Sequence, residues 1–344
     1  MSIESVTIKN FTVFNNIEVA FSKGINVIIG ENGTGKTHLM KAMYAIQQQS
    51  KEKINIFNEY FKSKNENSFV QNEMESGKLI LIPNNGETSS ENVLFYQVGI
   101  SDTLNSNEGL DVLVSGLSDN YFEFTYPKTK INTTFITAKD MMTHSEGFMS
   151  WYNDRDIPFD KIYYDIISKS LIRSFKRMPD IGKSVLPKIE NIIDGKVVIE
   201  NETFFIEKTD GRKVEFSLEA EGVKKIAILW QLIMNGSIEK DSVLFWDEPE
   251  ANINPALYKD VAEILLELSR NGVQIFVATH NYSFAKYMEV LSKDSDHVRY
   301  HALYKTDEGV KCETETKFAR LSNNALRDDN INLYDAEMKK EFEE

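Results

Sequence analysis

The sequence predicts an α/β protein with a mixed, largely parallel core sheet, an antiparallel β lobe and a short helical insertion. Three observations support this fold class. The β-rich run "INVIIG" leads into a glycine-rich loop and then into a helical segment, "KTHLMKAMYAIQQQ". The runs "SVLFW" and "VQIFVAT" are apolar throughout, which is typical of parallel strands covered on both faces. Further short strands between Asn/Gly/Ser turns predict the antiparallel part.

The composition limits the possible functions. With 344 residues and 41% hydrophobic content, the chain can bury one large core or two modest ones. Its formal charge of −14 predicts no general attraction for nucleic acid or an anionic membrane, although a local basic patch could still bind nucleic acid. The single cysteine, the lack of a signal-peptide pattern and the lack of a membrane-length apolar run predict a cytoplasmic protein.

The first half of the chain predicts mostly strands. "SVTIKNF" and "NIEVAF" read as strands that precede "INVIIG". Residues 51–77 are polar with a weak helical pattern. We then expect an antiparallel meander made of "KLILIP", "NVLFYQVGI", "YFEFTY" and "NTTFITA".

The second half begins with a helical stretch from about Glu146 to Lys188. Strands follow at "KVVIE", "TFFIEK" and "KVEFSL". Helices are then expected at 221–234, at 255–270 and after His280, separated by the two apolar strands. The end, "DDNINLYDAEMKKEFEE", predicts either a surface helix or a partner-dependent tail. We divide the chain into 1–145, a helical insertion 146–195, a lobe 196–320 and a charged tail 321–344, all parts of one unit.

The loop "GENGTGKT" has the residue types that hold a triphosphate. Glycines permit backbone angles and close approaches that a Cβ would block, so successive N–H groups can point at phosphate oxygens. Lys36 supplies a positive charge for the β- and γ-phosphates, and Thr37 offers a hydroxyl to Mg²⁺. The alternative is a chance glycine-rich turn. The predicted nucleotide-binding residues are Gly30, Asn32, Gly33, Thr34, Gly35, Lys36 and Thr37.

The segment "SVLFWDEPE" adds two carboxylates at the end of a buried strand. Asp247 can hold Mg²⁺ through water, and Glu248 can orient and deprotonate an attacking water. His280 ends the next apolar strand, where open α/β sheets bind ligands, so it is placed to contact the γ-phosphate. The alternatives are solvated acids and a structural histidine.

These motifs, in this order, resemble those of a known group. "IKNFTVFNNIEVAFSKGINVIIGENGTGKT", "FITAKDMMTHSEGF", "EAEGVKK", "LFWDEPEANINP" and "VATHN" are similar to the P-loop ABC-ATPase heads of the RecF, SMC and OLD group. The likeness is strongest to compact bacterial AAA-family ATPases of the OLD type, which occur in anti-phage defence and toxin-linked operons. The resemblance implies ATP and Mg²⁺ as cofactors, ATP hydrolysis, and a homodimer or higher homo-oligomer that holds ATP between copies.

The resemblance also assigns residues that would act across the dimer. Gly222 in "EAEGVKK" matches the signature glycine, Ala220 replaces the usual signature serine, and Lys224 is a candidate to take over that contact. An ordinary amphipathic helix with solvated lysines is the alternative. Asn254 matches the loop that crosses the interface. No glutamine occurs in "FITAKDM", where the family has one, and Lys139 or Asp140 stands in its place.

Two downstream functions follow from the resemblance. In the first, the ATPase regulates a separately encoded effector, such as a nuclease or toxin, in anti-phage defence. In the second, it is a RecF-like repair or recombination ATPase that binds duplex DNA. A scaffold with slow hydrolysis is a third possibility. The stretch 146–190 is too short for a long coiled coil, and His297 and His301 lack a third metal ligand, which indicates core or solvated histidines.

Overall fold

The computed structural model describes residues 2–48, 56–62, 95–99, 110–117, 120–127, 131–154 and 159–342. For the strands between residues 95 and 127 it describes the backbone only. The predicted strand "KLILIP" lies outside these ranges, as do most of residues 51–77.

A six-stranded sheet forms the centre of the molecule, in the order β14-β13-β3-β12-β11-β7. All neighbours run parallel except the β13–β14 hairpin. The predicted parallel core is therefore confirmed, and so is its mixed character. The strands are β3 (Ile25–Gly30), β7 (Thr133–Ile136), β11 (Val243–Asp247), β12 (Gln274–Ala278), β13 (Val298–Thr306) and β14 (Gly309–Glu315).

Both faces of this sheet are buried. Within β3, Ile25, Val27 and Ile29 belong to one hydrophobic cluster, whereas Ile28 belongs to a second cluster on the other face. This arrangement explains the continuous apolar runs in the sequence, because alternate side chains of a strand point to opposite faces.

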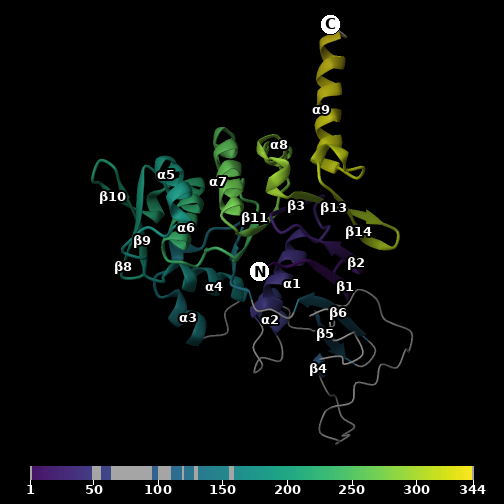
Figure 1. Cartoon of the computed structure of the whole chain (residues 1–344), viewed down its shortest axis with the longest axis horizontal. Coiled ribbons are helices and arrows are strands. Elements are labelled where there is room, and N and C mark those ends of the chain that lie inside the picture. The colour runs from purple at the N-terminus through teal and green to yellow at the C-terminus, as the bar shows by residue number, and fades with distance from the viewer. Residues whose placement is uncertain are drawn as a thin grey trace, which may run out of the picture.

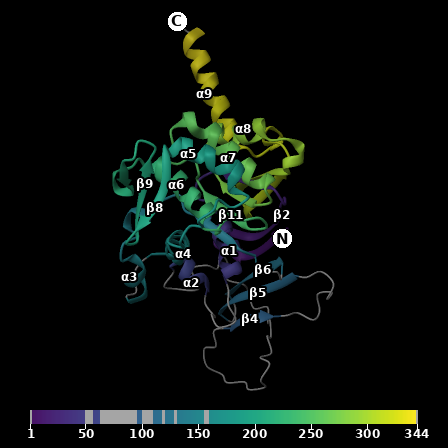
Figure 2. The ribbon, with the colours of Figure 1, turned by 60° about the vertical axis from the view of Figure 1, so that its left-hand side comes forward.

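The helices cover the central sheet on both sides (Figures 1 and 2). Residues of α1 pack in the same cluster as Ile28, whereas residues of α5, α6, α7 and α8 pack in the cluster that contains Val27. The helices are α1 (Lys36–Gln48), α2 (Ile56–Phe61), α5 (Gly182–Ile193), α6 (Glu221–Met234), α7 (Tyr258–Arg270) and α8 (Tyr282–Leu291).

A second sheet, antiparallel, has the order β2-β1-β6-β5-β4. It confirms an antiparallel lobe, but one assignment was wrong: "NTTFITA" forms β7, which pairs parallel with β11 in the central sheet. The strand β5 was not predicted, and it lies between β4 and β6. The strands are β1 (Ser5–Phe11), β2 (Phe14–Ala20), β4 (Phe95–Gly99), β5 (Leu110–Leu117) and β6 (Asn120–Pro127).

The helical stretch predicted from about Glu146 consists of short helices, as its length led us to expect. They are α3 (Phe148–Asp154), α4 (Lys161–Ser170) and α5, followed by a small antiparallel sheet of β8 (Gly195–Glu200), β9 (Thr203–Lys208) and β10 (Lys213–Glu215). The proposed division of the chain into four parts stays a prediction.

The last helix, α9 (Ala325–Phe342), projects from the body of the molecule beside α8 (Figure 1). It confirms the surface-helix alternative for the end of the sequence. His301 is fully buried between Asn26 and Thr314, so it is a core histidine. In the part of the chain that the structure describes, no helix is both long and apolar enough to span a bilayer.

Candidate nucleotide site

The glycine-rich loop joins the end of β3 to the start of α1, which confirms the predicted strand–loop–helix arrangement. The backbone of Gly35 has φ +86°, and a Cβ there would lie 2.6 Å from Val13 Cγ2, so only glycine fits. Gly33 also has positive φ, at +79°. Asn32 and Gly33 are exposed, whereas the Thr34 side chain is buried and donates to the Glu31 carbonyl at 2.8 Å. The loop therefore presents its backbone outward from a fixed base.

Lys36 lies across the mouth of this loop. Its Nζ donates to the carbonyls of Gly30 at 2.8 Å and Glu31 at 2.9 Å. Burial lowers the pKa of the Lys36 ammonium to about 8, although Asp247 and Glu248 act in the opposite direction. A buried cation held only by neutral carbonyls is suited to an anionic ligand, because a phosphate would give it a full charge partner.

Thr37 and Asp247 meet although 210 positions separate them in the sequence. The Thr37 hydroxyl donates to Asp247 Oδ2 at 2.9 Å, and the carboxylate is 8% exposed at the end of β11. Burial raises the pKa of the Asp247 carboxyl, and the hydrogen bond from Thr37 offsets this only in part. A nearby cation would stabilise the ionised form.

The donor set fits Mg²⁺ that arrives with a nucleotide. Within the described ranges, no three acidic, histidine or cysteine side chains gather as a metal site. One hydroxyl and one carboxylate are nevertheless what Mg²⁺ uses when phosphates and water supply its other ligands. Thr37 and Asp247 are therefore the residues that would hold the ion.

Glu248 and His280 form the next pair, at the ends of the neighbouring strands β11 and β12. Glu248 Oε1 lies 3.4 Å from His280 Nε2, and both side chains are about one-third exposed. The Glu248 backbone has φ +47°, and its N–H donates to the Ala278 carbonyl at 2.9 Å. Burial, with the charge of Lys36 second, lowers the pKa of His280, so the imidazole is neutral at pH 7.

Two buried residues that contact Glu248 or His280 were not predicted as functional from the sequence. Lys225 is 1% exposed and donates to the Glu248 carbonyl oxygen at 3.1 Å. Glu250 is buried, accepts a hydrogen bond from the Thr279 hydroxyl and accepts another from the His280 N–H at 3.3 Å. The second glutamate of "DEPE" was a usable signal for Glu250. No sequence pattern indicated that Lys225 is buried, because lysines are rarely buried.

The predicted signature region lies at the start of α6. Ala220 and Glu221 are exposed there, whereas Gly222 is buried. A Cβ on Gly222 would lie 2.7 Å from the Asn252 carbonyl oxygen, so the helix packs tightly on the loop after β11. Lys224 is buried too, with its Nζ bonded to Glu221 and, at 3.1 Å, to the Thr143 hydroxyl. A contact of Lys224 with a partner's nucleotide stays a prediction.

The remaining predicted residues surround this region. Asn254 is exposed, and its Oδ1 accepts from the Ala256 N–H at 3.0 Å, which caps a short 3-10 helix. Asp140 lies 3.8 Å from Lys224 Nζ, whereas Lys139 is exposed. The loop after β7 therefore reaches α6 through Asp140, one strand away from Asp247.

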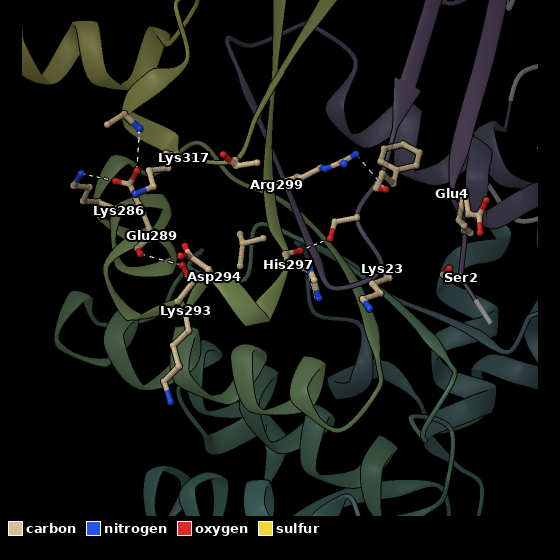
Figure 3. Close-up of a pocket in the computed structure, with 17 residues that line it drawn as sticks. Ser2, Glu4, Lys23, Lys286, Glu289, Lys293, Asp294, His297, Arg299 and Lys317 are labelled. Carbon is tan, nitrogen blue, oxygen red and sulfur yellow. Dashed lines mark hydrogen bonds and ion pairs between the residues drawn. The ribbon is translucent and has the colours of Figure 1, made fainter.

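A separate hollow of about 950 Å³ lies at the opposite end of β3 (Figure 3). It contains none of the predicted nucleotide-binding residues. Its wall is basic on balance, and Lys286 is paired there with Glu289. The charged residues that line it are Lys23, Lys286, Lys293, Arg299 and Lys317 against Glu4, Glu289 and Asp294, with His297.

Comparison with known proteins agrees with this geometry. The family described as "AAA domain, putative AbiEii toxin, Type IV TA system" matches residues 25–285. A segment of 46 residues is 48% identical to the DNA replication and repair protein RecF of Oceanobacillus iheyensis. This segment covers 13% of this chain and 12% of that protein. RecF of Listeria monocytogenes is 44% identical over 43 residues, 12% of each chain. The matched segment thus spans about one-eighth of these relatives.

A solved structure shows the same fold over most of the chain. The SMC head bound to the C-winged helix domain of ScpA superimposes with a TM-score of 0.52 at 14% identity, covering 92% of this chain and 98% of that one. At that identity the likeness concerns the fold alone. Together with the phosphate loop and the paired acids, these findings place the chain in the family described as "AAA domain, putative AbiEii toxin, Type IV TA system", with the fold of an SMC-type ATPase head.

Proposed function

We propose that this chain binds ATP with Mg²⁺ between two copies, hydrolyses it, and uses the resulting closure and opening to regulate a separately encoded effector in bacterial anti-phage defence. The observation that carries the proposal is the convergence of Lys36, Thr37, Asp247, Glu248 and His280 at the ends of β3, β11 and β12.

Each of these groups has a distinct chemical part. Lys36 and the loop N–H groups bind the phosphates, and Thr37 and Asp247 hold Mg²⁺, which stabilises negative charge on the phosphates when bound. The Glu248 carboxylate orients the attacking water and takes its proton. The neutral His280 carries one ring proton, which it donates either to Glu248 or to a phosphate oxygen.

The second copy completes the site in this proposal. The first turn of α6 leaves backbone N–H groups without helical partners, and the positive end of the helix dipole attracts phosphate. Ala220 and Gly222 lie in this turn, with Asn254 nearby, so the α6 terminus of one copy would face the γ-phosphate held by the other.

Regulation of a separate effector accounts for two further observations. Within the described residues, no acidic cluster of the kind that binds nuclease metals is present. The family description also names a type IV toxin–antitoxin system, a pair of proteins of which the matched domain is given as the putative toxin. The chain would then be the ATP-dependent control element, with a nuclease or toxin as its partner.

A RecF-like function in DNA repair or recombination is the second candidate. The identity to RecF over 46 residues and the basic hollow of Figure 3 favour it. Affinity for duplex DNA that falls steeply with salt would support this candidate, because phosphate contacts release counterions. Binding that is weak at low salt as well would exclude it.

The substitution Glu248→Gln tests the proposed chemistry. The amide side chain would keep the shape of the carboxylate but could not accept the proton of water, so turnover should fall by about 10² to 10⁴ while ATP binding persists. Phosphate release and calorimetric titration measure the two effects. Lys36→Ala serves as the contrast, because it should lose ATP binding. Unchanged turnover in Glu248→Gln would contradict the assignment.

A further inference from the structure

Two exposed surfaces of this chain have opposite charges, and apart from the Arg327–Asp328 pair their charged side chains have no ion pair within the described residues. The first is the loop after α4, residues 171–178, which we call the basic loop. The second is the projecting part of α9, residues 328–342. The basic loop carries three cations and no acid, whereas the projecting part of α9 carries five acids and two lysines.

The basic loop presents apolar and basic side chains together. Ile172, Phe175 and Met178 are exposed, with 53% of Phe175 open to solvent. Arg173, Lys176 and Arg177 alternate with them, and none has an ion pair with a described residue. Exposed apolar groups ringed by charge are typical of protein interfaces, whereas isolated surface charges remain solvated.

The backbone of this loop is fixed rather than free. The buried Gln231 amide donates to the carbonyls of Ser170 at 2.9 Å and Ile172 at 3.0 Å. The Phe175 N–H donates to the Met234 carbonyl at 2.8 Å, and the Phe175 ring lies against Gly236. The loop is therefore held on the C-terminal end of α6, and its exposed side chains are pre-organised for contact.

The projecting part of α9 is rigid only at its base. Asn324 is fully buried and caps the helix through its Oδ1, which accepts from the Arg327 N–H at 3.1 Å. Beyond residue 328 every residue up to 342 is exposed except the half-buried Met338. Fifteen residues of helix extend about 22 Å, and an isolated helix of that length is marginally stable in water.

This helix also carries an apolar stripe. Ile331, Tyr334, Met338 and Phe342 follow a spacing of three, four and four residues, which places them on one side of the helix, whereas the exposed Leu333 lies on the opposite side. Tyr334 is 60% exposed. Asp335 and Glu341 flank the stripe, and like Glu337 they have no ion pair with a described residue.

We propose that the projecting part of α9 of one copy docks on the basic loop of a second copy. The apolar stripe would cover Phe175 and its neighbours, and the acids would face Arg173, Lys176 and Arg177. We place the contact between two copies because α7 and α8 lie between α9 and α5, the helix that follows the basic loop (Figure 1).

The proposed contact between copies lies away from the candidate nucleotide site. The basic loop lies at the C-terminal end of α6, and Gly222 lies at the other end, about 20 Å away along the helix. Association through α9 should therefore occur without ATP. A single helix face is small compared with a stable interface of about 1,600 Å², so we expect weak, concentration-dependent association that high salt reduces.

Charge reversal in the full chain tests this contact. Every protein tested carries Lys36→Ala, so that nucleotide-bridged assembly does not contribute. Sedimentation velocity without nucleotide measures association of the parent, of the loop variant (Arg173→Glu, Lys176→Glu, Arg177→Glu) and of the helix variant (Asp335→Lys, Glu337→Lys, Glu341→Lys). Each of these two variants should associate at least about tenfold more weakly than the parent, because attraction becomes repulsion.

Combining both reversals in one chain restores opposite charges and should restore association. A matched control, Lys196→Glu, Lys240→Glu and Lys259→Glu, changes the net charge of the chain as much as the loop variant does, at exposed positions elsewhere, and should associate like the parent. Circular dichroism melts identify any variant that fails to fold. If one of the single-surface variants fails to fold, the association of the combined variant tests the proposed contact. A monomeric parent, a control as weak as the loop variant, or a folded combined variant that stays monomeric would overturn the proposal. None of these results bears on ATP hydrolysis.

Discussion

Lys36 and Lys225 are two buried lysines with different surroundings. Burial lowers the pKa of each ammonium. Lys36 donates only to neutral carbonyls and faces the open loop, whereas Lys225 is enclosed, with Glu250 as its strongest charge neighbour. The first lysine is thus suited to bind a ligand, and the second to position the backbone of Glu248.

The pKa of Lys36 predicts how nucleotide affinity depends on pH. The free ammonium has a pKa of about 8, and phosphates should raise it, so the bound state holds a proton that the free state loses above that pH. Affinity should therefore be constant below about pH 8 and fall above it, at most tenfold per pH unit. Calorimetry between pH 7 and 10 measures this. Lys36→Arg is the control, because arginine stays protonated and its profile should be flat.

Lys225→Met should separate the positioning of Glu248 from nucleotide binding. Loss of the hydrogen bond to the Glu248 carbonyl would misplace the carboxylate and lower kcat by about 10- to 100-fold, with little change in KM. It would also remove the positive charge of Lys225, with which the buried Glu250 interacts, so we expect the free energy of unfolding to fall by about 0.5–3 kcal/mol.

The double variant Lys225→Met, Glu250→Gln distinguishes these two effects. It should recover most of the lost stability in thermal melts but not the lost kcat. Full activity in the single variant would mean that Lys225 has a structural role only.

At the scale of elements, α6 links the two ends of the proposed machinery. Its first turn carries Gly222, which packs on the loop after β11, and Lys225, three residues further on, bonds to the same loop at Glu248. A shift of this helix would therefore change the position of Glu248. Its other end, through Gln231, holds the basic loop.

Gly222→Ala tests the tight packing of α6. Alanine in a helix is favoured over glycine by about 1 kcal/mol, so an unconstrained position would become more stable. Here the new Cβ would lie 2.7 Å from the Asn252 carbonyl oxygen, and overpacking of this kind costs about 1–3 kcal/mol. We expect a net loss of stability by thermal denaturation. A stabilised Gly222→Ala would contradict the packing.

The sequence predicted the bounds of individual helices and strands better than which strands pair with one another. The bounds of β1, β3 and α6 agree with the structure, because local patterns and turn residues mark them. "NTTFITA" was assigned to the wrong sheet, because the pattern of a short strand does not specify its neighbour. In the structure both Thr133 and Thr134 are buried, on opposite faces of β7, as expected of a strand in the central sheet. The burial of Lys225 depends on tertiary carboxylates, which no local pattern contains.

At the scale of the whole molecule, the parallel sheet brings the residues of the candidate nucleotide site together. Lys36, Asp247 and His280 are far apart in the sequence, yet β3, β12 and β11 are neighbours and end at one edge. The motifs in the sequence predicted this convergence, because parallel strands share the direction of their carboxyl ends. In the proposed function, the α6 terminus of a second copy covers the side of the nucleotide that faces away from the loop.

Mixing two inactive variants tests this shared site most directly. Lys36→Ala should not bind ATP, and Ala220→Arg should block the exposed α6 terminus without disturbing its own loop. If sites are shared, neither variant hydrolyses ATP alone, but a heterodimer contains one site with an intact Lys36 and an intact α6 terminus. An equimolar mixture should then recover about a quarter of the parent turnover. Full activity of Ala220→Arg alone, or no recovery in a mixture shown to form heterodimers, would contradict ATP held between two copies.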